Sequence, residues 1–205
     1  MRYNIHKPKP VLIVVILNTT IMQPLKNITE NIKQYAKSLS EDGFHQIFNH
    51  IDQFKIKEGV DRLGLDKFID QCAYLAAGSG VISGSGGLFT MIIGIPLDFM
   101  NLITQQFRVT MAIMYANRGT YDIGFNEFMS LVAASLKVEA SVAITKTMME
   151  SVAEKMLMIF GTRTAERLIP VVGAAIGGTT NYLFIRRMAK MVKKMQVEPV
   201  VVQVF

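Results

Sequence analysis

The stretch PLDFMNLITQQFRVTMAIMYANRG, residues 96–119, decides the fold. Proline fits the first turn of a helix, where its missing N–H group is not needed, and glycine is a typical residue just beyond a helix end. Between Pro96 and Gly119 the segment is mostly apolar over about six helical turns. We therefore expect a long helix that runs from Pro96 to about Asn117.

The segments on both sides of this helix show helical rather than alternating spacing of their apolar residues. They contain few prolines and are long enough for several further helices. The expected helices cover residues 25–39, a segment from Ser40 or Glu41 to Phe54, a segment from Leu65, residues 125–160 as one helix or two in tandem, and a helix capped by Thr162 or Thr164.

The composition fits one folded domain with an unusually low charge. The chain has 205 residues, of which 50% are hydrophobic and 19% are charged, against about a quarter charged in typical soluble domains. A single cysteine, Cys72, excludes a disulfide framework and any multi-cysteine metal site. We predict an all-α, single-domain helical bundle over residues 23–196, with tails at residues 1–22 and 197–205. Met22 is an alternative translation start, in which case residues 1–21 would not belong to the protein.

Two glycine-rich stretches carry no charge. Residues 71–97 form the first, with 27 uncharged positions, and residues 168–185 form the second, with 18. Their small residues recur every four positions, a spacing that allows close helix packing in lipid. The stretches therefore insert fully or partly into a membrane, or they permit tight crossings in a soluble bundle, and they can pack on each other as a hairpin. The glycines concerned are Gly80, Gly84, Gly87, Gly173 and Gly177.

A polar stripe runs along the 96–117 helix. Its members are three or four residues apart, so they share one narrow face of an otherwise apolar helix. The stripe is either a buried polar relay, a ligand-facing stripe, or the solvated face of an amphipathic helix. The four residues are Asp98, Asn101, Gln105 and Arg108.

Basic residues concentrate at the C-terminal end, where residues 136–205 carry a net charge of +5. Five of them have helical spacing on one side of a segment that is otherwise largely apolar. This pattern is typical of a helix at a membrane interface, of the cytoplasmic flank of an inserted segment, or of the solvated face of a bundle helix. Nucleic acid is not expected, because no aromatic residues are interleaved with the cations. The five residues are Arg186, Arg187, Lys190, Lys193 and Lys194.

No pattern in the chain predicts catalysis. The glycines match neither the phosphate-binding nor the dinucleotide-binding spacing. His45 and His50 are five residues apart, which does not place them on one helical face for a metal ion. We therefore expect no catalytic residue, no cofactor and no metal site, and a protein that is not an enzyme.

The order of these features resembles the EcsC family of bacterial proteins, over roughly residues 40–195. That family shows a glycine-rich segment, a Pro-x-Asp-like helix start, a turn rich in Tyr, Gly and Asp, and an IPxxGAxxGG-like stretch before a terminal Ala-Lys helix. An Asp often follows that last glycine pair, where this chain has Asn181. The matching residues are Pro96, Asp98, Tyr115, Gly119, Tyr121, Asp122, Ile169, Pro170, Gly173, Ala174, Gly177, Gly178, Ala189 and Lys190.

The resemblance implies a non-enzymatic accessory role, since the namesake of the family is encoded beside the two components of an ABC transporter. We expect a membrane-associated protein at the cytoplasmic face of the inner membrane, bound to lipid or to a membrane protein such as an ABC transporter component. The alternative is a soluble helical module that binds a protein or an apolar ligand in a groove along the 96–118 helix.

Overall fold

The computed structural model describes residues 23–78, 97–120, 122–139, 144–166 and 170–197. These residues form helices and short connections and contain no strand, so the all-α prediction is confirmed. In chain order the elements are α2 (Gln23–Ser38), the π-helical turn η2 (Leu39–Gly43), α3 (Phe44–Asn49), the 3-10 turn η3 (Ile51–Phe54), α4 (Ile56–Leu63), α5 (Leu65–Ala77), α6 (Leu97–Arg118), α7 (Phe125–Ser135), α8 (Lys146–Glu166) and α9 (Pro170–Val197).

Helix α6 forms the centre of the bundle. It contacts α4, α5, α7, α8 and α9. Every residue from 100 to 114 is buried except Arg108, which is half-buried. The helix ends at Arg118, and Gly119 follows with a φ of +73°, the left-handed conformation that favours glycine at this position.

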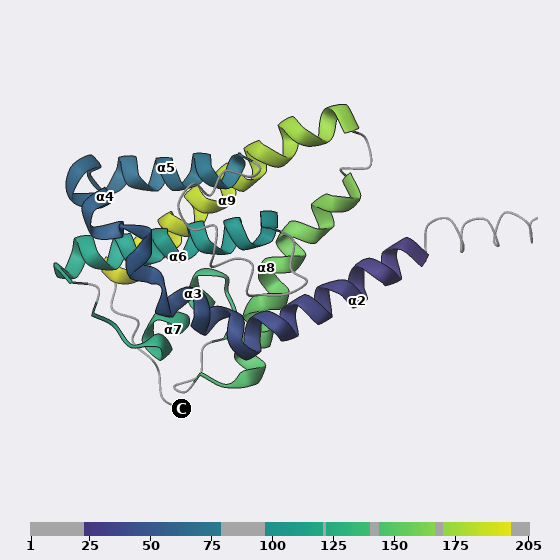
Figure 1. Ribbon diagram of the computed structural model, residues 1–205, viewed down its shortest axis with the longest axis horizontal. Coiled ribbons are helices and arrows are strands. Elements are labelled where there is room, and N and C mark those ends of the chain that lie inside the picture. The colour runs from purple at the N-terminus through teal and green to yellow at the C-terminus, as the bar shows by residue number, and fades with distance from the viewer. Residues whose placement is uncertain (1–22, 79–96, 121, 140–143, 167–169, 198–205) are drawn as a thin grey trace, which may run out of the picture.

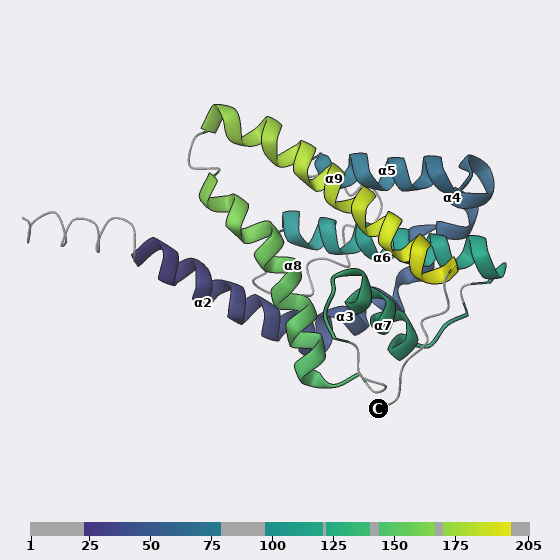
Figure 2. The ribbon, with the colours of Figure 1, turned by 180° about the vertical axis from the view of Figure 1, so that it is seen from behind.

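The other helices cover α6 from several sides (Figures 1 and 2). Helices α5 and α9 run side by side on one side of it, while α3 and α7 lie on the other. Helix α2 packs on α8 at the end of the bundle. The buried hydrophobic residues form one cluster that extends from Ala36 in α2 to Val192 in α9. No described helix has both the length and the apolar character needed to cross a membrane.

The single helix predicted between residues 40 and 54 is wrong. The chain instead forms η2, α3 and η3, and η3 is followed by Lys55, whose φ of +48° is left-handed. The break lies at His50, which leaves the helical conformation while its ring nitrogen Nδ1 binds the carbonyl of Gln46 at 2.7 Å. This local hydrogen bond competes with continuation of the helix. Helix α4 follows directly and was not predicted.

The two-helix alternative for residues 125–160 is the correct one. Helix α7 ends at Ser135, and Lys137 turns the chain with a φ of +57° while Val138 N–H binds the carbonyl of Ala133. This is a helix-ending turn of the kind that usually contains glycine. Because the residue is a lysine, no local sequence pattern indicated this turn.

The predicted cap at Thr162 or Thr164 is also wrong. Both residues lie inside α8, which continues to Glu166. The next helix, α9, begins at Pro170, whose ring suits a first helical position.

Candidate functional site

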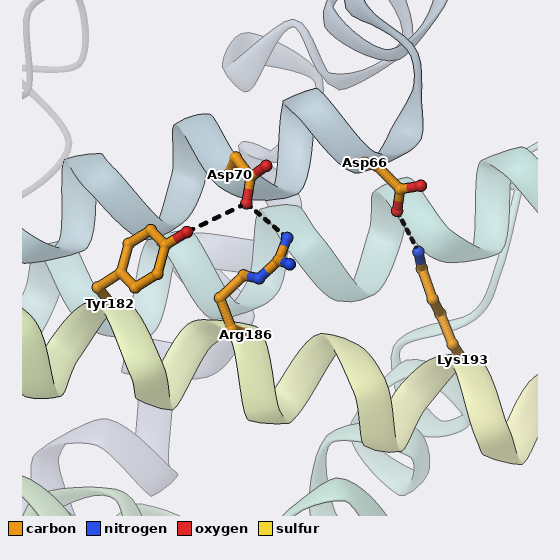
Figure 3. Close-up of polar contacts among 5 residues, drawn as sticks. All are labelled: Asp66, Asp70, Tyr182, Arg186 and Lys193. Carbon is orange, nitrogen blue, oxygen red and sulfur yellow. Dashed lines mark hydrogen bonds and ion pairs between the residues drawn. The ribbon is translucent and has the colours of Figure 1, made fainter.

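Two acidic residues of α5 bind three residues of α9 along the seam between these helices (Figure 3). The carboxylate of Asp70 accepts hydrogen bonds from the guanidinium of Arg186 at 2.5 Å and from the hydroxyl of Tyr182 at 3.4 Å. The carboxylate of Asp66 pairs with the ammonium of Lys193 at 2.5 Å. The earlier acidic residue pairs with the later basic one, so the two helices run antiparallel.

These contacts shift the acidity of the groups that they join. The hydrogen bond from Lys193 and its positive charge lower the pKa of Asp66. Desolvation, and then the negative charge of Asp70, raise the pKa of the Tyr182 hydroxyl. The Asp66 side chain is 82% exposed and the Asp70 side chain 39%. Exposed ion pairs add little to stability. We therefore infer that these pairs set how α9 is oriented against α5 and contribute little to the free energy of its packing.

The other three cations of α9 lie on its outer face. Arg187, Lys190 and Lys194 are exposed, and none of them forms an ion pair with an acidic residue in the described part of the chain. Leu183 is 45% exposed and shares their face, four residues before Arg187. We call Leu183, Arg187, Lys190 and Lys194 the outer stripe. The structure thus divides the five predicted cations into two at the seam and three that face water.

An exposed aromatic ring lies near the seam. Tyr74 in α5 is 67% exposed, the largest exposure among the described large hydrophobic residues. Its ring centroid lies 5.0 Å from that of Tyr182 in α9. The α5–α9 pair therefore presents two large apolar groups, Tyr74 and Leu183, together with the three outward cations.

The end of α5 is capped by side chains from two other helices. The last carbonyl groups of a helix have no partner within it. The Asn101 amide of α6 donates to the carbonyl of Leu75 at 2.8 Å, and the Asn181 amide of α9 donates to the carbonyl of Ala76 at 3.1 Å. The next carbonyl, that of Ala77, lies against Gly178, where an added Cβ would be 3.1 Å from its oxygen.

The polar stripe of α6 is an internal hydrogen-bond chain, so its interpretation as a solvated face is wrong. Gln105 donates to Asn101 at 3.0 Å, and Arg108 donates to Gln105 at 2.8 Å. Asn101 is 5% exposed and Gln105 only 3%. The Arg108 guanidinium lies 5.1 Å from the ring centroid of Phe68. Asp98 stands in the first turn of α6, and its side chain is outside the described set.

No group of three or more His, Cys, Asp or Glu side chains is placed to hold a metal ion among the described residues. Cys72 is fully buried, and burial raises the pKa of its thiol to about 11 although the charge of Arg108 opposes the shift. A thiol in this state is a weak nucleophile at neutral pH.

The predicted glycines fall mainly outside the described side chains. Gly80, Gly84 and Gly87 lie in the undescribed residues 79–96. Gly173 and Gly177 lie in the first turns of α9, of which only the main chain is described. The neighbouring Gly178 makes the close approach to α5, and the packing role expected of the five glycines stays a prediction.

Sequence reasoning missed Asp66, Asp70 and Tyr182. Their partners lie more than 100 residues away in the chain, so no local sequence pattern indicated these contacts. The comparisons with protein-family models, with curated proteins and with solved structures found no match to this chain.

Proposed function

We propose that this protein is a non-enzymatic, membrane-associated accessory protein of the EcsC type. It acts at the cytoplasmic face of the inner membrane, where it serves a membrane-protein complex such as an ABC transporter. Anionic lipid orients it there through the outer stripe of α9.

The composition of the outer stripe carries this proposal. Its four residues comprise three cations and one leucine, and no acidic residue stands among them in the sequence of α9. Cations near an anionic bilayer are attracted by about 1 kcal/mol each, and an exposed leucine adds apolar contact at the interface. The exposed ring of Tyr74 supplies a second group that suits the headgroup level, since its body is apolar and its tip is polar.

The two glycine-rich stretches support the same orientation. Helix α5 ends at Ala77 within the first uncharged stretch, and α9 begins within the second. Both stretches therefore join the helix pair that presents the outer stripe. Their small residues and lack of charge favour contact with lipid or with a membrane protein.

Vesicle sedimentation tests the electrostatic part of the proposal. The triple variant Arg187→Gln, Lys190→Gln, Lys194→Gln should bind vesicles of phosphatidylglycerol and phosphatidylcholine about 100-fold more weakly than the unchanged protein. The matched control is Lys33→Gln, Lys37→Gln, Lys155→Gln, which removes three exposed cations from α2 and α8. Equal losses of vesicle affinity in both triple variants would show that net charge alone sets the affinity. That result would contradict the role proposed for the outer stripe.

Cell fractionation tests the location itself. Membranes washed with high salt should release the protein if the outer stripe alone holds it, whereas retention through an alkaline carbonate wash indicates insertion of the glycine-rich stretches. A protein found wholly in the soluble fraction would overturn the proposal. That result would favour the alternative, a soluble helical binding module.

A further inference from the structure

A pocket of about 460 Å³ lies at the C-terminal end of α6, and no residue of the outer stripe lines it. Its volume is in the range of small-molecule sites, about 300–1,000 Å³. Buried apolar side chains form its floor, among them Ile51 of η3, Met111 of α6 and Ile123 from the connection to α7. Two exposed carboxylates, Asp52 and Asp122, line it together with Lys57.

The positive charge of Lys57 is paired with a carboxylate at the protein surface, where both side chains are about half exposed. Its ammonium pairs with the carboxylate of Asp61 at 3.0 Å, and the hydroxyl of Tyr115 donates to the other oxygen of that carboxylate at 2.8 Å. The hydrogen bonds from Tyr115 and Lys57 lower the pKa of Asp61, so this carboxylate stays ionised beside the lysine. The lysine therefore does not offset the other carboxylates of the pocket.

Asp52 and Asp122 consequently leave the pocket negative. Neither side chain forms an ion pair with a basic residue in the described ranges. The C-terminal end of α6 adds partial negative charge from its last carbonyl groups. Arg118, the basic residue in the last turn, is paired with Glu127 of α7 at 2.7 Å and is not free to neutralise that end.

We propose that this pocket binds an alkylammonium group. The cation lies beside the carboxylates of Asp52 and Asp122, and the alkyl chain lies on the apolar floor of Ile51, Met111 and Ile123. The same chemistry is carried by a free aliphatic amine and by a lysine side chain of another protein. Lys57 and Tyr115, both bound to Asp61, also line the pocket.

Titrations followed by NMR test this site with defined probes. We expect n-butylammonium, or Nα-acetyl-lysine amide, to bind with a dissociation constant on the order of 1 mM, as suits a ligand of this size. Asp52→Asn and Asp122→Asn should each weaken binding about five- to tenfold, because each removes one carboxylate from the cation. Asp42→Asn is the matched control, since Asp42 is exposed but does not line the pocket.

The probes also separate the two sources of the cation. Stronger binding of n-butylammonium supports a small amine as the ligand, and stronger binding of the capped lysine supports a protein side chain. Equal binding of n-butanol or n-butyrate would overturn the proposal, since neither carries a positive charge. Absence of binding by both amines at about 10 mM, or equal affinity in the Asp52→Asn, Asp122→Asn and Asp42→Asn variants, would overturn it as well.

Discussion

The side-chain amide of Asn181 in α9 donates a hydrogen bond to the main-chain carbonyl of Ala76 near the end of α5, at 3.1 Å. This contact explains why an amide suits this position better than the Asp that is common in the EcsC-like pattern. An ionised carboxylate accepts hydrogen bonds but donates none. At residue 181 it would face a carbonyl oxygen that also only accepts.

We therefore expect Asn181→Asp to lower the free energy of unfolding by about 2 kcal/mol at neutral pH, since it removes a donor and leaves two acceptors facing each other. Urea denaturation followed by circular dichroism measures this change. The control is Asn126→Asp, an exposed position in α7 at which the same substitution should change stability by less than about 0.5 kcal/mol. Equal stability of the two variants would contradict the capping role of Asn181.

The sequence predicted the helices whose signals are local. Helix α6 has a proline at its start, a glycine after its end and an apolar body between them, and its predicted and observed bounds agree within about a residue. The sequence signals failed where the chain leaves a helix at a residue that has no strong preference for a turn conformation. Lys55 and Lys137 both take the left-handed conformation, which lysine seldom adopts, so nothing in their neighbourhood indicated a turn.

The candidate site could be predicted only in part. The basic residues of α9 were visible because they follow one another at helical spacing. Their division between the seam and the outer stripe depends on Asp66 and Asp70, which lie 116 or more residues earlier. The stripe on α6 was likewise visible, but its burial follows from the packing of α5 and α9 around it, which periodicity does not reveal.

A close contact between Gly59 of α4 and Phe68 of α5 predicts the effect of a single methyl group. A Cβ at residue 59 would lie 2.4 Å from the nearest ring carbon of Phe68, which is 1% exposed. We expect Gly59→Ala to destabilise the fold, because overpacking costs about 1–3 kcal/mol and exceeds the helix preference of alanine, about 1 kcal/mol.

A double-mutant cycle with Phe68→Leu checks the cause. The smaller side chain leaves room for the methyl group, so Gly59→Ala should cost less in the Phe68→Leu background than in the unchanged protein. Gly124→Ala is the control. Nothing lies within 4 Å of a Cβ at that position, so its cost should be the same in both backgrounds. Equal costs of Gly59→Ala in both backgrounds would show that the ring is not the obstacle.

The pairing of Asp66 with Lys193 predicts a pH dependence of stability. The hydrogen bond and charge of Lys193 lower the pKa of Asp66 in the folded protein below its ordinary value of 3.8. The stability from this pair is therefore fully present above about pH 4 and is lost as the pH falls through the lowered folded-state pKa. Asp66→Asn should reduce the urea midpoint slightly at about pH 6, and by progressively less as the pH falls below about 4. A larger effect at the acidic end would contradict the pairing.

The burial of Cys72 predicts that its thiol reacts slowly. Its pKa of about 11 leaves a very small thiolate fraction near neutral pH, and the residue is fully covered in the folded protein. Labelling by an aromatic disulfide reagent should be slow in buffer and rise steeply in urea, with the same midpoint as the unfolding transition. Rapid labelling in buffer would mean that the α5–α6 contact opens without global unfolding.

Asp66 and Asp70 form ion pairs with two of the five cations of α9, Lys193 and Arg186. Removal of these two carboxylates should therefore raise the affinity for anionic membranes, which tests the membrane proposal. The double variant Asp66→Asn, Asp70→Asn frees Arg186 and Lys193, which are already 44% and 38% exposed on the flank of the outer stripe. If α9 meets anionic lipid, this variant should bind phosphatidylglycerol vesicles about tenfold more tightly, because each added cation contributes about 1 kcal/mol at most and the two lie to one side. The control Asp42→Asn, Glu58→Gln changes the net charge by the same amount at exposed positions outside the α5–α9 pair and outside the pocket. An equal gain in the control would show that total charge sets the affinity, and no gain in either variant would mean that this flank of α9 does not face the bilayer.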